Sequence, residues 1–112
     1  MQIDYRFLKK ILNIMQERQS HYISVQELME DVRGLYPDTD KEEYTDLFFG
    51  HLYLLKDNEV IKELSGTNIR LTSKGYDLAK VLNKNEILEK LKRFTLNEAL
   101  HITNAVIANS KI

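Results

Sequence analysis

The sequence predicts a mainly α domain of the α+β class, in which one small β-hairpin lies among several helices. Three observations lead to this prediction. Apolar residues recur at helical spacing along several segments, and a capping residue followed three positions later by an acidic residue marks several helix starts. One Gly-containing turn separates two short runs with strand character, which is typical of a hairpin. The length of 112 residues suits a single domain.

The first helix is expected over residues 4–18. Its apolar residues cover about half of the helix circumference, and a stripe of this width predicts packing on more than one neighbour. The residues of this stripe are Tyr5, Phe7, Leu8, Ile11, Leu12, Ile14 and Met15.

A short strand at residues 22–23 and a second helix are expected next. Ser24 and Glu27 have the spacing of a capping box, which predicts the start of the second helix. Gly34 is expected at the end of this helix, and Pro37 three residues later supports the same boundary.

The central helix is expected over residues 40–57. Two overlapping capping boxes, at residues 39–42 and 40–43, leave its start open by one residue. Asn58 is expected to end it, because Asn tolerates the left-handed conformation found at many helix ends. Its inward face is expected to consist of Tyr44, Leu47, Phe48, His51, Leu52, Leu54 and Leu55. Its outward face is expected to consist of Glu42, Thr45, Asp46, Phe49, Tyr53 and Lys56.

The hairpin is expected to have strands at residues 60–64 and 68–72, joined by a Ser-Gly-Thr turn. Because side chains alternate along a strand, Ile69 and Leu71 should point inward and Arg70 outward.

Three further helices are expected after the hairpin. Thr72 or Ser73 should cap one that runs to about residue 82, and Gly75 should let it begin close to the hairpin. A helix at residues 86–93 and a last helix capped by Thr95 follow. The apolar residues of the last helix span an arc of about 160°; they are Leu96, Ala99, Leu100, Ile102, Val106 and Ile107.

Helix, short strand, helix, helix, hairpin is the order of a winged helix-turn-helix. The segments HLYLLKDNEVI and IRLTSKGYDLAKVL resemble a family of small bacterial and prophage winged-helix proteins of unknown function. The residues that carry the resemblance are His51, Leu52, Leu55, Ile61, Arg70, Leu71, Thr72 and Gly75. The resemblance implies a winged-helix fold with a hairpin wing, and a mobile-element origin. We therefore expect a winged-helix domain at residues 1–82 and a helical extension at residues 83–112.

Charge is distributed unevenly, although the net charge is only −1. Residues 1–20 carry four basic and two acidic groups, residues 21–60 carry three basic and ten acidic groups, and residues 61–112 carry nine basic and five acidic groups. The start of the central helix is acidic, at Asp38, Asp40, Glu42, Glu43 and Asp46. Acidic groups at a helix N-terminus suit the helix dipole, but they repel DNA phosphates.

Two functions are expected, and the sequence leaves both open. The first is a DNA-binding protein, such as a transcriptional regulator of bacterial or prophage type, which is an analogy from the fold. The wing would then contact double-stranded DNA, through Lys62, Thr67, Asn68, Arg70 and Lys74. The second is a protein–protein interaction module that does not bind DNA.

The outward face of the central helix would contact either kind of partner, through Thr45, Phe49, Tyr53 and Lys56. Phe49 and Tyr53 are the most informative pair on this face. They are either core residues covered by the C-terminal helices or an exposed aromatic pair, which suits a protein partner better than a duplex.

No catalytic constellation is present, so an enzyme is not expected. The three histidines lie far apart in sequence outside any ligand motif, cysteine is absent, and the glycines form no phosphate-binding loop. Neither a metal nor a cofactor is therefore expected, and His51 is expected to be a hydrogen-bonded core histidine. No apolar run approaches about 18 residues and no signal-peptide pattern is present, so a cytoplasmic protein without a membrane partner is expected.

A homodimer through the terminal helices is also expected. Both terminal helices have apolar stripes too wide for a lone surface helix, and C2 pairing is the commonest arrangement of identical chains. The alternative is that the two helices bury each other within one chain.

Overall fold

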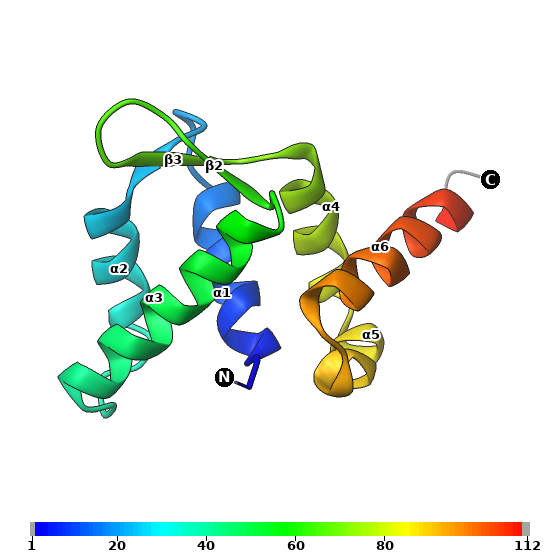
Figure 1. Ribbon diagram of the computed structural model, residues 1–112, viewed down its shortest axis with the longest axis horizontal. Helices are drawn as coiled ribbons and strands as arrows, with labels where there is room; N and C mark the ends of the chain where they lie inside the picture. Colours follow the sequence, from blue (N-terminus) through cyan, green and yellow to red (C-terminus); the bar gives the residue numbers. More distant parts are fainter. Residues whose placement is uncertain (1, 111–112) are drawn as a thin grey trace.

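The computed structural model describes residues 2–110 as a mainly helical chain with a small antiparallel sheet, as the sequence predicts (Figure 1). Its elements are α1 (Tyr5–Gln16), β1 (Ile23–Ser24), α2 (Val25–Arg33), α3 (Lys41–Asp57), β2 (Ile61–Glu63), β3 (Asn68–Leu71), α4 (Ser73–Leu82), α5 (Asn85–Lys90), the 3-10 helix η1 (Leu91–Arg93) and α6 (Leu96–Ser110).

The three strands form an antiparallel sheet in the order β1–β3–β2. Ile23 of β1 lies opposite Ile69 of β3, and Lys62 of β2 lies opposite Arg70 of β3. Ile69 and Leu71 are buried, as alternation along the strand predicts. The turn places Gly66 at φ 69°, a conformation that favours glycine.

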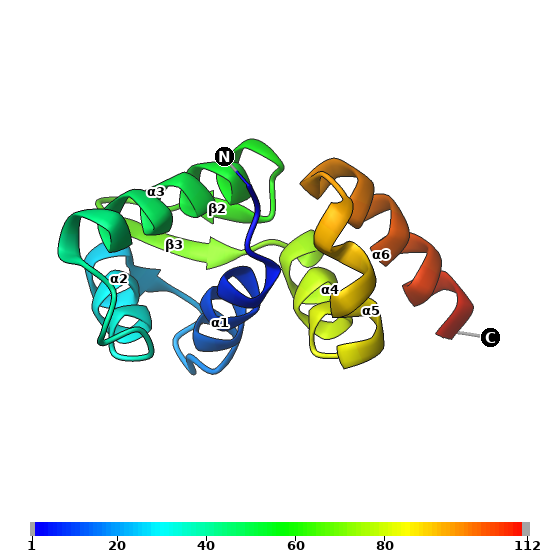
Figure 2. The ribbon, with the colours of Figure 1, turned by 90° about the horizontal axis from the view of Figure 1, so that it is seen from below.

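Helix α1 occupies the centre of the molecule, between α2 and α4 (Figure 2). It also contacts β3, so the prediction of more than one neighbour is confirmed. Its buried residues are Tyr5, Phe7, Leu8, Ile11, Leu12 and Met15. The chain itself therefore covers the apolar stripe of α1, which leaves this helix no broad apolar face for a second copy.

The structure shows which residue caps each end of α3. Asp40 is the N-cap, because its carboxylate accepts hydrogen bonds from the backbone N–H groups of Glu42 and Glu43. Asn58 ends α3 as its C-cap, which confirms the predicted helix end, but the left-handed conformation given as the reason is not adopted, since the φ of Asn58 is −100°. Its side-chain amide instead donates to the carbonyl oxygen of Leu54 at 2.9 Å, and Glu59 has the positive φ of 59°.

Helix α4 begins tightly against the hairpin. Thr72 is its N-cap, since its hydroxyl accepts a hydrogen bond from the backbone N–H of Gly75 at 3.3 Å. A Cβ atom on Gly75 would lie 2.4 Å from the carbonyl oxygen of Val60 and 2.9 Å from Cδ2 of Leu71. The predicted close approach at Gly75 is therefore confirmed.

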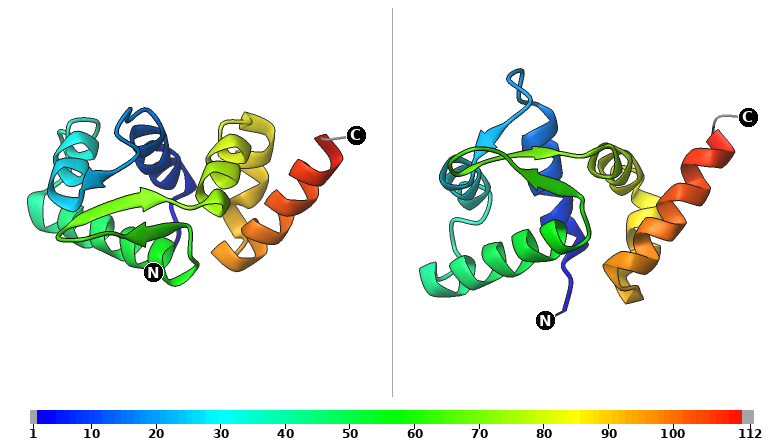
Figure 3. Two further views of the ribbon diagram at one scale, coloured as in Figure 1. Left: turned by 90° about the horizontal axis from the view of Figure 1, so that it is seen from above. Right: turned by 45° about the horizontal axis from the view of Figure 1, so that its top comes forward.

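The C-terminal helices α5 and α6 pack on α4, on the side of α1 that faces away from α2 (Figure 3). The helix expected at residues 86–93 is divided into α5 and η1. The capping box of α6 is formed, because the hydroxyl of Thr95 accepts from the backbone N–H of Glu98 at 3.2 Å. Helix α6 packs mainly on α4, so burial of α6 against α1, the alternative to a dimer, is not the arrangement found.

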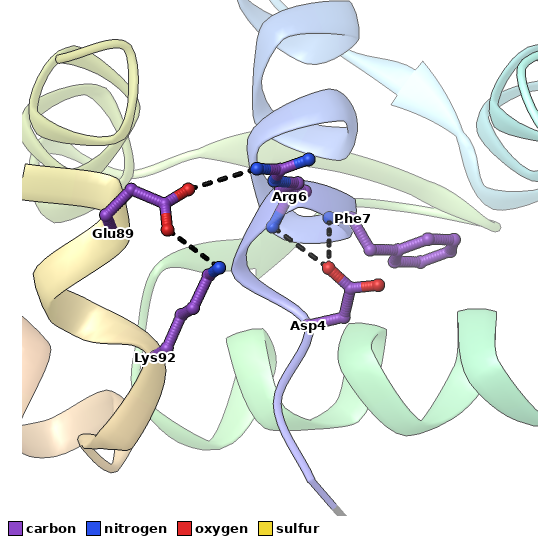
Figure 4. Close-up of polar contacts among 5 residues, drawn as sticks. All are labelled: Asp4, Arg6, Phe7, Glu89 and Lys92. Carbon is purple, nitrogen blue, oxygen red and sulfur yellow. Dashed lines mark hydrogen bonds and ion pairs between the residues drawn. The ribbon is translucent and has the colours of Figure 1, made fainter. Parts of the chain in front are cut away.

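Polar contacts attach α5 and η1 to the start of α1 (Figure 4). Glu89 forms ion pairs with Arg6 at 3.0 Å and with Lys92 at 2.7 Å. The hydroxyl of Tyr5 donates to the carbonyl oxygen of Phe94 at 2.7 Å. Burial raises the pKa of Tyr5 to about 12, so this hydroxyl remains a donor across the physiological range.

Candidate functional site

A hollow of about 260 Å³ lies between α3 and the hairpin, and we call it the α3–hairpin hollow. Its lining residues are Val25, Phe49, Leu52, Tyr53, Lys56, Glu63, Gly66, Thr67, Asn68 and Ile69. Five of the site residues expected from the sequence therefore meet here: Phe49, Tyr53, Lys56, Thr67 and Asn68. The other four, Thr45, Lys62, Arg70 and Lys74, are not among the lining residues.

The two aromatic side chains of the hollow have different environments. Phe49 is half-buried, and its ring centre lies 5.3 Å from that of Phe48, a core residue, in an edge-on arrangement. The ring centre of Tyr53 lies 5.9 Å from that of Phe49, but Tyr53 is 54% exposed. Phe49 therefore belongs partly to the core and Tyr53 to the surface. The residues that surround this pair come from α2, α3 and the hairpin, so the C-terminal helices do not cover it as one of the two alternatives expected.

Lys56, the basic residue of the hollow, has its charge offset within the chain. Its ammonium group forms an ion pair with Glu63 of β2 and lies 5.6 Å from the ring centre of Tyr53. The hydrogen bond with Glu63 raises the pKa of Lys56. The pair therefore contributes little net charge to the hollow.

The acidic start of α3 consists of Asp38, Asp40, Glu42, Glu43 and Asp46, all of which are exposed. Within residues 2–110, none of these carboxylates forms an ion pair with a basic side chain. Thr45 lies among them, but its hydroxyl already donates to the carbonyl oxygen of Lys41 at 2.8 Å. This end of the helix therefore presents negative charge to solvent.

The basic residues expected on the wing do not gather in one place. Lys62 and Arg70 lie opposite each other, on the face of the hairpin away from the buried Ile69 and Leu71. Lys74 forms an ion pair with Glu59 at 3.4 Å. It also lines a separate small hollow against α6, with Asn97, Leu100, His101, Thr103 and Asn104.

His51 is fully buried and has a structural role, as the sequence predicts. Its Nε2 accepts a hydrogen bond from the backbone N–H of Asp4, so its Nδ1 carries the proton and donates to the carbonyl oxygen of Leu47 at 2.8 Å. Burial lowers its pKa, which favours the neutral ring. Both ring nitrogens are engaged in hydrogen bonds, so His51 is poorly suited to ligate a metal or accept a substrate proton.

Some residues that line the α3–hairpin hollow were not expected from the sequence to belong to a site. The periodicity of the sequence assigns Leu52 and Ile69 to the core, and they form the floor of the hollow. No sequence signal links Glu63 to Lys56, because the ion pair depends on how β2 packs beside α3. An ion pair between residues of two different secondary-structure elements leaves no pattern within a short stretch of sequence.

Across residues 2–110 no group of three or more His, Asp or Glu side chains is arranged to hold a metal ion. In the same range, no helix is long and apolar enough to cross a membrane. Comparisons with models of protein families, with curated proteins and with solved structures found no match for the chain.

Proposed function

We propose that the chain is a winged-helix protein whose α3–hairpin face binds another protein. The order of helices and strands, the β1–β3–β2 sheet and the family resemblance of the α3–hairpin–α4 segment support the winged-helix assignment. In this assignment α3 is the recognition helix and β2–β3 is the wing. Residues 1–82 form the domain, and α5 and α6 extend it.

The chemistry of the recognition helix is the observation that favours a protein partner over DNA. In helix-turn-helix docking, the N-terminal part of this helix enters the major groove. Here that part carries the acidic start of α3, whose five carboxylates form no ion pair within residues 2–110. Phosphate attraction supplies most of the non-specific affinity of DNA-binding proteins, so this charge works against a duplex.

The exposed aromatic side chain of Tyr53 supports the same conclusion. Tyr53 presents more than half of its surface at the edge of a preformed hollow. Tyrosine is enriched among the residues that dominate protein–protein binding energy, because it combines a large apolar area with a hydrogen-bonding group.

Site-specific photo-crosslinking in cells of the native host tests this proposal. Photoreactive p-benzoylphenylalanine would replace Tyr53 in one variant and the exposed Glu86 of α5 in a matched control. We expect a covalent adduct with a protein from position 53 and none from position 86. Adducts with DNA from position 53, or equal protein adducts from both positions, would contradict the proposal.

DNA binding through the wing is the second candidate, and one observation favours it. Lys62 and Arg70 are directly opposite in the β2–β3 ladder, and like charges at opposed positions destabilise a sheet. Neither residue forms an ion pair within residues 2–110. A phosphate group bound between them would relieve the repulsion.

A further inference from the structure

Two chemically different surfaces adjoin along the outward face of α3. One is the α3–hairpin hollow, which begins at Phe49. The other is the acidic start of α3. Glu42 precedes Phe49 by seven residues, which is nearly two helical turns, so it lies almost directly in line with Phe49 and roughly 10 Å along the axis. A partner long enough to reach from the hollow toward Glu42 therefore meets both surfaces.

The hollow suits a bulky apolar side chain. Leu52 and Ile69, each 2% exposed, form its floor with Phe49. Its polar members include Glu63, Thr67 and Asn68 on the hairpin and Lys56 on α3. Because Glu63 is paired with Lys56, no unpaired charge would be buried when an apolar group enters.

The acidic surface suits a cationic group. Residues 38–46 contain five carboxylates and one basic residue, Lys41. Carboxylates this close together repel one another, and a partner carrying Lys or Arg removes part of that repulsion when it binds.

We propose that the partner segment is basic and carries one bulky apolar anchor. This inference rests on the proposed protein-binding function and adds the chemistry of the partner. The anchor fills the α3–hairpin hollow, and lysine or arginine side chains of the same segment lie over the acidic start of α3. An extended chain advances about 3.3 Å per residue, so the first basic residue falls roughly three positions from the anchor.

A random twelve-residue peptide library, displayed on phage and selected against the full chain, tests the proposal. Enriched peptides would be synthesised and their affinities measured for the native chain and for three variants. Tyr53→Ala removes one wall of the hollow. Glu42→Gln combined with Glu43→Gln and Asp46→Asn removes charge at nearly constant size. Glu86→Gln, on α5, is the matched control for loss of a distant carboxylate.

The expected peptides carry an aromatic or large aliphatic residue with Lys or Arg about three positions away. Tyr53→Ala should weaken their binding about tenfold or more. The triple amide variant should weaken it about three- to tenfold at low salt and much less at high salt, because exposed charges are screened. Glu86→Gln should leave it unchanged.

Other outcomes distinguish a failure of the basic-partner inference from a failure of the proposed protein-binding function. In one such outcome, the peptides depend on Tyr53 for binding but lack basic residues, or they bind the triple variant as tightly as the native chain. Either result would overturn the basic-partner inference and leave the proposed protein-binding function standing. Peptides unaffected by either variant, or a selection that enriches no binder, would count against both.

Discussion

The backbone N–H of Asp4 donates a hydrogen bond to Nε2 of His51 at 2.9 Å, which joins the cap of α1 to the middle of α3. The carboxylate of Asp4 meanwhile caps α1, accepting from the backbone N–H groups of Arg6 and Phe7. A protonated His51 would carry a second N–H that points at the N–H of Asp4. The hydrogen bond therefore requires a neutral ring.

This hydrogen bond predicts that acid destabilises the fold. The pKa of His51 is lowered in the folded chain, so below about pH 6.5 the unfolded chain binds more protons than the folded one. The contribution of His51 to the free energy of unfolding is thus fully present above about pH 6.5. It falls as the pH drops below this value, by up to about 1.4 kcal/mol per pH unit. Urea unfolding at pH 7.5, 6.5 and 5.5 measures this slope.

Two variants isolate the contribution of His51. His51→Gln should lower stability at pH 7.5 but flatten the slope between pH 6.5 and 5.5, because glutamine does not titrate. His101→Gln replaces an exposed histidine by the same residue type, glutamine, and serves as the matched comparison for the change at position 51. An equal slope in the native chain and in His51→Gln would refute this explanation.

Gly75→Ala should destabilise the junction of α4 and the hairpin. The added Cβ would overlap the carbonyl oxygen of Val60, and overpacking of this kind costs about 1–3 kcal/mol. Gly34→Ala is the matched control, since its φ is −58° and its Cβ would approach no closer than 3.4 Å to another residue. That variant should be neutral or more stable by up to about 1 kcal/mol. Chemical denaturation of both variants decides the comparison.

Phe49→Ala and Tyr53→Ala should separate packing from binding. Phe49 is half-buried, so its loss should cost about 2 kcal/mol, less than the roughly 3–5 kcal/mol typical of a fully buried phenylalanine. Tyr53 is mostly exposed, so its loss should change stability by no more than about 0.5 kcal/mol. Thermal unfolding measures both values. A large loss of stability in Tyr53→Ala would show that this residue is needed for packing.

If the wing binds DNA, Lys62→Ala combined with Arg70→Ala should weaken binding to all duplexes alike. The slope of log affinity against log salt should flatten by about 0.9 for each phosphate that the variant no longer neutralises. Fluorescence anisotropy with duplexes of unrelated sequence gives both quantities. Lys80→Ala with Lys84→Ala removes two exposed charges elsewhere and should have a smaller effect. Unchanged affinity in the wing variant would remove the DNA candidate.

Deletion of residues 95–112 should produce an aggregating chain, because α6 packs on α4. Leu96 and Ala99 of α6 are buried, and their removal would expose the apolar surface that they cover. Light scattering on the truncated chain tests this expectation. The same measurement on the intact chain tests the dimer, since one chain has a mass of 13.2 kDa. A folded, monomeric truncation would show that α6 serves assembly instead.

The sequence alone determined most of the local structure. Capping residues and helical periodicity predicted where helices begin to within one residue. The sequence left Thr39 or Asp40 and Thr72 or Ser73 open, and the structure places the caps at Asp40 and Thr72. The Gly66 turn and the alternation along residues 69–71 predicted the hairpin. These signals are readable because each depends on residues within one or two turns of one another.

Only the tertiary structure decided how distant segments meet. In the folded chain, α2 and α4 cover the apolar stripe of α1. Lys74 lies beside α6 and not on the hairpin face, and Lys56 forms an ion pair with Glu63. The tertiary structure also divided Phe49 from Tyr53 in exposure, although both belong to the same helical face. Burial depends on which elements pack against a face, and periodicity identifies the face without identifying what covers it.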